Sequence, residues 1–311
     1  MIDIQQWLFE SIVQPTLLFL HLGTYIEDAY GAVELFEWGC LEITLIALVL
    51  VPLQHWRPVE KTTNHATVRV DIIYTLLNRL GIIRLVIFLS LGPLLSDLFG
   101  VLRGFDVPSL GFNGFGTFQL DQIWPNVTDD PIASLVIYLI TFDFVGYWIH
   151  RAQHRSNAWW ALHSLHHAQQ QMTCWSDNRN HLIDDVVLNV LMVCTGFLIG
   201  VSPSQFILIG VVTDLSQSLQ HANLRLSFGR LGERLWVSPR FHRLHHSVEH
   251  GFEHNFGVLV PWWDILFGTA NFDDRYGATG VKDQVEKNMD YGHGFWAQQW
   301  LGLKRFKAAW I

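Results

Sequence analysis

Closely spaced histidines are the residues of this chain with the clearest capacity for chemistry. They form three clusters, which are His150 with His154, then His163 with His166 and His167, then His242 with His245 and His246. Residues three or four positions apart lie one turn above each other on an α-helix, so each cluster can aim two or three imidazole nitrogens at one point. Neutral imidazole nitrogen suits iron, zinc, copper and nickel. The spacing therefore predicts a buried centre that could hold two metal ions.

A histidine-rich surface is the alternative interpretation of the same residues. A single pair of histidines four positions apart is usually a solvated helix face. Here twelve of the sixteen histidines lie between His150 and His254, so the enrichment is local. The chain offers little competing chemistry, because its glycines show no nucleotide fingerprint or phosphate loop and its three cysteines have no ligand spacing. Three clusters beside apolar segments favour metal binding.

One carboxylate shares a helix face with the first cluster. Asp143, Tyr147, His150 and His154 follow one another at intervals of four, three and four residues and form a continuous polar stripe. A carboxylate within a membrane helix is costly unless it has a partner. Asp143 could accept a hydrogen bond from a ligating imidazole and fix its tautomer, or it could pair with an arginine of another helix. The residues alone leave both possibilities open.

Two isolated histidines are further ligand candidates. His181 opens an apolar run with Asp184 and Asp185 one turn on, and His221 follows the next run. A lone histidine at a helix end is commonly a capping or surface residue. We expect both to join the ligand set, because the predicted topology brings both helix ends next to the clusters. The remaining histidines are expected at supporting or surface positions, and they are His21, His55, His65, His250, His254 and His293.

The composition indicates a membrane protein. Hydrophobic residues make up 50% of the 311 positions, and the mean hydropathy is +0.22, which is more apolar surface than one soluble core of this length needs. Fourteen tryptophans suit aromatic belts at the two faces of a bilayer. A net charge of −8 argues against a nucleic-acid partner.

Apolar runs predict an all-α integral membrane protein with about four to five membrane helices. Three runs have about the length needed to cross a ~30 Å hydrocarbon layer and are expected to span it. They cover residues 38–54, 70–96 and 131–149. Residues 183–200 and 203–219 are shorter and joined by a tight turn, so they predict a helical hairpin that enters the bilayer and returns. Residues 7–22 contain Glu10 and Pro15, which suits an interfacial or re-entrant segment.

Charged residues predict the orientation of these helices. Residues 1–37 hold six acids and no lysine or arginine, and the 97–130 loop has one arginine against five aspartates. The 55–69 loop is basic and is therefore expected on the cytoplasmic side. Its cations are Arg57, Lys61 and Arg69. Counting helices from this loop places every histidine cluster on the cytoplasmic side, in a helical cap over the membrane bundle.

Taken in order, these residues resemble the fatty acid hydroxylase superfamily, the sterol desaturase-like integral membrane di-iron oxygenases. The resemblance covers roughly residues 131–273 and rests on six elements in the same order. They are Asp143 through Tyr147-Trp148 to His150-Arg151 and His154, the cluster His163 to His167, His181 ahead of Asp184, the stretch Gln220 to Leu226, Pro239 to His246, and Asn255-Phe256-Gly257 followed by Trp262 to Thr269. Two positions depart from the family pattern, because many relatives have proline in place of Leu182 and some have a histidine in place of Gln217.

The resemblance implies an enzyme that uses O2 to hydroxylate or desaturate a C–H bond of a membrane lipid. Its cofactors would be two iron ions, with electrons passing from NAD(P)H through a separate cytochrome b5- or ferredoxin-type protein, because no fused cytochrome b5 domain is visible. The implied catalytic carboxylates beside the metals are Asp143 and Asp184. The implied ligands are His150, His154, His163, His166, His167, His221, His242, His245 and His246, with His181 as a tenth.

Two other functions are compatible with a cluster of histidines. A membrane zinc hydrolase would need one open metal position and a carboxylate base, for which Asp184 or Asp185 is available, but nine imidazoles exceed what one hydrolytic zinc uses. A metal carrier or sensor would spread its ligands along a path through the membrane. We expect four regions: an acidic interfacial segment over 1–37, two membrane helices with an outer loop over 38–130, the catalytic domain over 131–273 and a tail over 274–311.

Overall fold

The computed structural model of the protein describes residues 2–86, 120–249 and 253–310, with residues 90, 91, 94 and 98. In these residues every regular element is a helix, as expected, and one isolated β-bridge joins Ser247 to Thr279. Parts of the expected segment 70–96 and of the outer loop, together with His250, lie outside the described residues.

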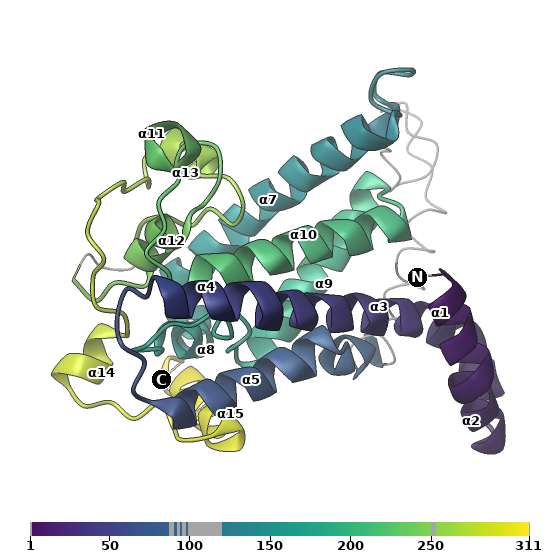
Figure 1. Ribbon diagram of the computed structural model, residues 1–311, viewed down its shortest axis with the longest axis horizontal. Helices are drawn as coiled ribbons and strands as arrows, with labels where there is room; N and C mark the ends of the chain where they lie inside the picture. Colours follow the sequence, from purple (N-terminus) through teal and green to yellow (C-terminus); the bar gives the residue numbers. More distant parts are fainter. Residues whose placement is uncertain are drawn as a thin grey trace.

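The longest helices lie side by side along one axis (Figure 1). They are α3 (Ile26–Leu45), which continues through a π-helical turn into α4 (Val51–Trp56), α5 (His65–Arg79), α7 (Pro131–Arg155), α9 (Leu182–Ile199) and α10 (Pro203–His221). Two shorter helices, α8 (Asn157–His167) and α12 (Pro239–His245), gather at one end of this bundle. The remaining short helices at that end are α11 (Gly229–Gly232), α13 (Trp262–Leu266), α14 (Lys282–Glu286) and α15 (Phe295–Ala308).

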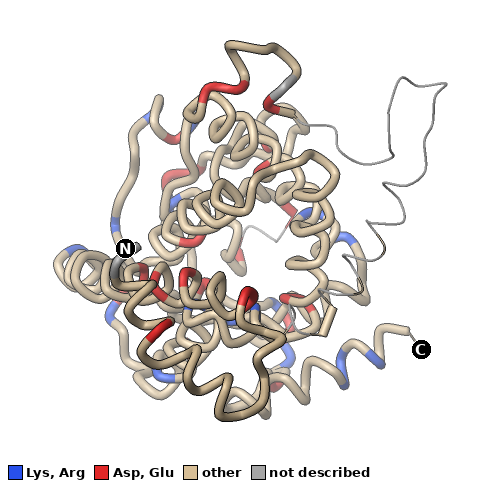
Figure 2. Tube along the Cα trace, turned by 90° about the vertical axis from the view of Figure 1, so that its right-hand side faces the viewer, with Lys and Arg blue, Asp and Glu red and all other residues tan. Residues whose placement is uncertain are grey.

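The opposite end of the bundle is crossed by the N-terminal helices α1 (Ile2–Leu8) and α2 (Gln14–Phe19) (Figure 1). Figure 2 shows the molecule along the bundle axis, with the long helices seen end-on. In this view the C-terminal helix α15 runs across the field instead of along the line of sight. The molecule therefore has an axial bundle with helices lying across both of its ends.

Three helices are long and apolar enough to cross a membrane, judged by length and composition in the described residues: Gly23–Trp56, Pro131–Arg155 and Leu182–Ile199. The expected spans 38–54 and 131–149 fall inside the first two, and the first arm of the expected hairpin coincides with the third. Its second arm, α10, does not meet the same criterion, because polar residues such as Asp214 and Gln217 interrupt its apolar run.

The prediction of a single helix over residues 70–96 is wrong in its first half. The helix begins earlier, at His65, and α5 ends at Arg79. Gly81 then takes a φ of +76°, and the chain is helical again at residues 82–86. A left-handed glycine ends a helix at little cost, because it has no Cβ to clash with the backbone. The apolar composition of the run hid this break.

Local capping sets where the histidine-bearing helices begin. Asp130 accepts hydrogen bonds from the backbone N–H groups of Ile132 and Ala133 at the start of α7. Ser156 and Ser238 accept from the backbone of the first turns of α8 and α12 in the same way. Side-chain caps of this kind satisfy N–H groups that have no partner within the helix. They therefore help to define the register of the histidine faces.

Candidate metal centre

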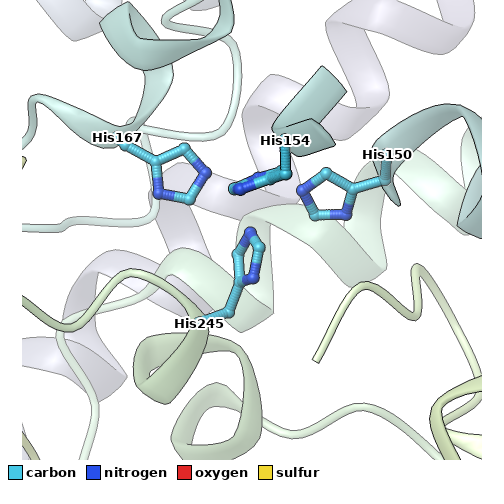
Figure 3. Close-up of side chains that lie close together, drawn as sticks. All are labelled: His150, His154, His167 and His245. Carbon is cyan, nitrogen blue, oxygen red and sulfur yellow. The ribbon is translucent and has the colours of Figure 1, made fainter. Parts of the chain in front are cut away.

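The structure gathers eight histidines into two compact groups at one end of the bundle. In each group, four imidazoles offer nitrogen atoms that all lie within 4.8 Å of one another. The first group is His150 and His154 from α7, His167 from α8 and His245 from α12, and Figure 3 shows its rings converging. The second group is His166 from α8, His221 from α10, and His242 and His246 from the α12 region. The rings are almost entirely enclosed by protein.

Each three-histidine cluster contributes to both groups. His242 and His246, four residues apart, join the second group, while His245 joins the first. The other cluster is divided as well, because His166 joins the second group and His167 the first. Consecutive helical residues point about 100° apart, so a helix lying between two sites can serve both. The groups are therefore adjacent, and the rings of His167 and His246 stack at 4.2 Å between them.

Hydrogen bonds alone cannot explain how closely the nitrogen atoms of the second group approach one another. The Nε2 atom of His221 lies 3.1 Å from the Nε2 atoms of both His166 and His242. The Nδ1 atom of His221 is 2.8 Å from the Gln217 carbonyl oxygen, so it carries the proton and leaves Nε2 with one lone pair. That lone pair can accept from only one of the two neighbours. Nitrogens about 2.1 Å from one ion lie roughly 3 Å apart at a right angle, so the spacing fits a shared cation.

Buried nitrogens without protein partners mark the first group. The Nε2 atoms of His154 and His245 are enclosed and have no hydrogen-bond partner. The Nδ1 atom of His245 donates to the carbonyl oxygen of His254 at 2.7 Å, and that of His150 donates to Phe256 at 2.9 Å. Such contacts fix the tautomer that leaves Nε2 free to bind a metal. A buried nitrogen without a partner is costly, and a metal ion would relieve this cost.

Burial keeps these rings neutral. Desolvation, followed by repulsion from neighbouring imidazoles, holds the pKa of His166, His167, His242, His245 and His246 well below the usual value. Neutral imidazole is the form that binds metals. The residues present therefore fit two metal ions with all-nitrogen ligand sets.

His163 lies beside the first group but outside both sets of four. Its ring is 5.1 Å from the ring of His154 and 5.3 Å from those of His150 and His166. Its Nδ1 atom is 3.0 Å from Asp184 Oδ2, and its buried Nε2 atom has no hydrogen-bond partner. The ring is therefore held in the orientation that a ligand would need.

Asp184 supports this arrangement from α9. One of its oxygens contacts His163, while the other accepts from Gln153 Nε2 at 2.7 Å and Trp159 Nε1 at 2.6 Å. Its two oxygens therefore join α7, α8 and α9. This engagement makes Asp184 a poor candidate for a hydrolytic base, because a base must be free to take a proton from water.

His181 lies elsewhere. Its ring Nε2 is 2.9 Å from the carbonyl oxygen of Gln299 in α15, and its Nδ1 accepts the backbone N–H of Ile183. Neither group of four includes it. His181 thus caps the start of α9, which is a common role for a lone histidine at a helix end. It also bonds α15 through the Gln299 carbonyl oxygen.

Asp143 contacts neither an imidazole nor an arginine in the described structure. Its Oδ1 accepts the backbone N–H of Leu259 at 2.6 Å, and its Oδ2 accepts the indole N–H of Trp263 at 2.9 Å. Both sequence hypotheses for its partner were therefore wrong. A carboxylate on a candidate membrane helix here holds the loop that follows the histidine-bearing segment of α12.

That loop contains positioning residues that sequence reasoning missed. Asp264 accepts the backbone N–H groups of Phe256 at 2.8 Å and Gly257 at 2.7 Å. Asn255 donates to the carbonyl oxygens of Phe241 and Asn271. These bonds hold the carbonyl groups of residues 254 and 256 that accept from His245 and His150. The Asn-Phe-Gly and Trp-Trp-Asp motifs were the available signal, but their spacing does not reveal which carbonyl groups they position.

Comparison with known proteins places these residues in a family. The fatty acid hydroxylase family model matches residues 135–269. An ornithine lipid hydroxylase (OlsE) of Rhizobium tropici is 31% identical over 172 residues, which are 54% of this chain and 51% of that protein. An alkylglycerol monooxygenase of Caenorhabditis elegans is 30% identical over 128 residues, covering 41% of this chain and 25% of that protein.

A third relative is named for another class of molecule. A very-long-chain aldehyde decarbonylase (GL1-7) of Oryza sativa subsp. japonica is 25% identical over 186 residues, which are 54% of this chain and 28% of that protein. The chain thus spans about half the length of the first relative and about a quarter of the other two. No solved structure matches it significantly. The resemblance seen in the sequence is confirmed: residues 135–269 match the fatty acid hydroxylase family model and form a fatty acid hydroxylase domain.

Proposed function

We propose that the protein is a membrane-bound di-iron oxygenase that uses O2 to hydroxylate or desaturate a C–H bond of a lipid-type substrate. The observation that carries this proposal is the pair of adjacent, buried, all-imidazole groups. Nitrogen ligands suit iron, while magnesium and calcium prefer oxygen. When bound, two irons would supply the redox chemistry with O2 that amino-acid side chains lack.

The ligand set that we propose has nine imidazoles. His163 follows the pattern of the other cluster, in which residues four apart serve one group and the third residue serves its neighbour. We therefore assign His163 to the first group with His167, which lies four residues on. The proposed ligands are His150, His154, His163, His167 and His245 for one iron, and His166, His221, His242 and His246 for the other.

The residues around the centre have a separate task, which is to exclude water. Phe256 is fully buried, and its ring lies 5.2 Å from that of His154 and 5.7 Å from that of His245. Trp160 lies 4.9 Å from His154 and 5.2 Å from His167. A dry, aromatic wall limits side reactions of a reactive centre and strengthens electrostatic interactions inside it.

The substrate class is proposed from the relatives and the fold together. The relatives are named for ornithine lipids, alkylglycerols and very-long-chain aldehydes, all of which carry long apolar chains. In the described residues, three apolar helices could span a membrane, which would place the site beside a bilayer that contains such molecules. We further propose that the histidine end of the bundle faces the cytoplasm, where a cytochrome b5- or ferredoxin-type protein could deliver electrons derived from NAD(P)H.

Metal analysis combined with an oxygen assay tests the proposal. Purified protein should contain two irons per chain and consume O2 when given a reductant and membrane lipid extract. Mass spectrometry of lipids from cells with and without the gene should reveal a product heavier by one oxygen or lighter by two hydrogens. Turnover without O2 in a zinc-loaded sample would instead support a hydrolase, and bound metal with no turnover would support a carrier or sensor.

A pair of histidine variants supplies the matched control. His245→Ala removes a ligand from the first group and should abolish product formation while the protein still inserts into membranes. His55→Ala changes an exposed histidine outside both groups and should leave activity unchanged. Full activity in His245→Ala would remove that residue from the ligand set.

A further inference from the structure

The C-terminal helix α15 turns two tryptophans to the outside and two glutamines to the protein. Its buried face consists of Gln298, Gln299 and Gly302. On the other side Trp296 and Trp300 are 77% and 60% exposed, and Trp310, two residues past the end of the helix, is 72% exposed. Exposed tryptophans opposite buried glutamines are unusual for a surface helix of a soluble protein, which turns its apolar stripe inward. Something other than this chain's own core must therefore cover the tryptophans.

Positive charge accompanies this tryptophan stripe. Lys304 and Lys307 are exposed, and the Lys304 ammonium lies 5.6 Å from the centre of the Trp300 ring. Residues 295–310 contain no acid. In the described part of the chain no carboxylate pairs with either lysine. The helix thus has a local excess of cations on a chain whose net charge is −8.

The direction of α15 matches the plane of a membrane. The candidate spans run along the bundle axis in Figure 1, whereas α15 runs across that axis in the end-on view of Figure 2. The helix lies at the histidine end of the bundle, while α1 and α2 cross the other end. The continuous helix Gly23–Trp56 between these ends has 34 residues and is about 50 Å long. This length exceeds the ~40–45 Å of a bilayer with its headgroups.

We propose that α15 is an interfacial helix that rests in the headgroup layer at the histidine end of the bundle, with anionic lipids as its partner. Tryptophan prefers the boundary between headgroups and acyl chains, and lysines beside it attract anionic headgroups. The helix binds the lipid surface through its outer face and the catalytic domain through its inner face.

The inner face connects this surface directly to the metal-binding helices. Gln299 accepts from the His181 ring through its carbonyl oxygen and from the backbone N–H of Leu182 through its side chain. A Cβ atom on Gly302 would lie 2.3 Å from the His181 ring, so the helix and the start of α9 are in close contact. Arg305 reaches the carbonyl oxygen of Ala161 in α8, two residues before His163. The depth of α15 in the lipid therefore sets the depth of the metal centre.

Depth-dependent quenching tests this placement in the full-length protein. An environment-sensitive fluorophore is attached at Trp300→Cys in a chain whose three native cysteines are replaced by alanine, and the protein is reconstituted into vesicles of neutral and anionic phospholipids. Lipids with brominated acyl chains should quench this label several-fold more than a label at Glu286→Cys, an exposed residue of α14. We expect the Trp300 label ~5–10 Å within the headgroup and acyl boundary. If Trp300→Cys does not fold, Trp296→Cys samples the same stripe.

The charge and the alternative partners are tested in the same system. The double variant Lys304→Glu and Lys307→Glu should reduce the quenching in anionic vesicles and have little effect in neutral ones. Equal quenching of the Trp300 and Glu286 labels, with both open to aqueous iodide, would overturn the proposal. Protection from iodide without lipid quenching would also overturn it, since a second copy of the chain or another protein would then cover the stripe. Energy transfer between differently labelled copies separates those two cases.

Discussion

Replacing Asp184 by asparagine should remove His163 from metal binding without touching a ligand. The carboxylate accepts hydrogen bonds from three donors: His163 Nδ1, Gln153 Nε2 and Trp159 Nε1. An asparagine can keep its carbonyl oxygen toward Gln153 and Trp159, which turns its NH2 group toward His163. The imidazole must then accept at Nδ1 and carry its proton on Nε2. The nitrogen that faces the metal centre would lose its lone pair.

The size of the effect follows from the bond that is lost. A hydrogen bond to a charged group contributes about 1.5–3 kcal/mol, and each 1.4 kcal/mol is a factor of ten in an equilibrium constant. We therefore expect the affinity of one metal site to fall by roughly 10- to 100-fold, in the range seen when partners of ligating histidines are removed. The second group contains no residue bonded to Asp184 and should keep its affinity.

Metal titration in chelator-buffered solutions measures both affinities. Asp185→Asn is the matched control, because Asp185 is the buried neighbour on the same helix and no hydrogen bond joins it to His163 in the described structure. It should leave both affinities unchanged. Thermal unfolding of each variant shows whether the fold is retained.

A double-mutant cycle decides whether Asp184 acts through His163. In a His163→Ala background, Asp184→Asn should weaken metal binding no further, because the ring it orients is already gone. Additive losses in the double variant, or wild-type affinity in Asp184→Asn alone, would refute the argument and leave Asp184 as a structural tie between helices.

Three other perturbations distinguish the roles of nearby residues. His181→Ala should retain two metals per chain by elemental analysis while loosening α15, and loss of a metal would return His181 to the ligand set. Gly257→Ala places a Cβ atom 2.6 Å from the Val260 carbonyl oxygen and 2.8 Å from Asp264, so metal content of the first group should fall. Gly210→Ala, with nothing within 4 Å, should leave that content unchanged. Removal of metal by a chelator should lower the melting temperature, since an ion present at 100 times its Kd stabilises a fold by about 2.7 kcal/mol; an unchanged melting temperature would argue against a metal in the buried groups.

Local spacing was sufficient to identify much of the candidate site. Histidines four residues apart share a helix face whatever surrounds them, so His150 with His154 and His242 with His246 could be recognised from the chain alone. The apolar lengths of residues 38–54 and 131–149 likewise predicted helices, because helix length and hydropathy are local properties. The isolated His221 was also correctly expected beside the clusters, since its helix was predicted to return to the same end of the bundle.

Tertiary packing decided which point each helix face meets. The partner of His150 is a carbonyl group 106 residues away, and that of His181 is 118 residues away. Such contacts depend on how distant helices and loops dock, which no local periodicity contains. In the folded chain His181 contacts α15, and Asp143 binds a loop backbone in place of an imidazole or arginine. His166 and His167 belong to different groups. Sequence spacing thus determined which side chains share a face, and only the folded chain determined what those faces bind.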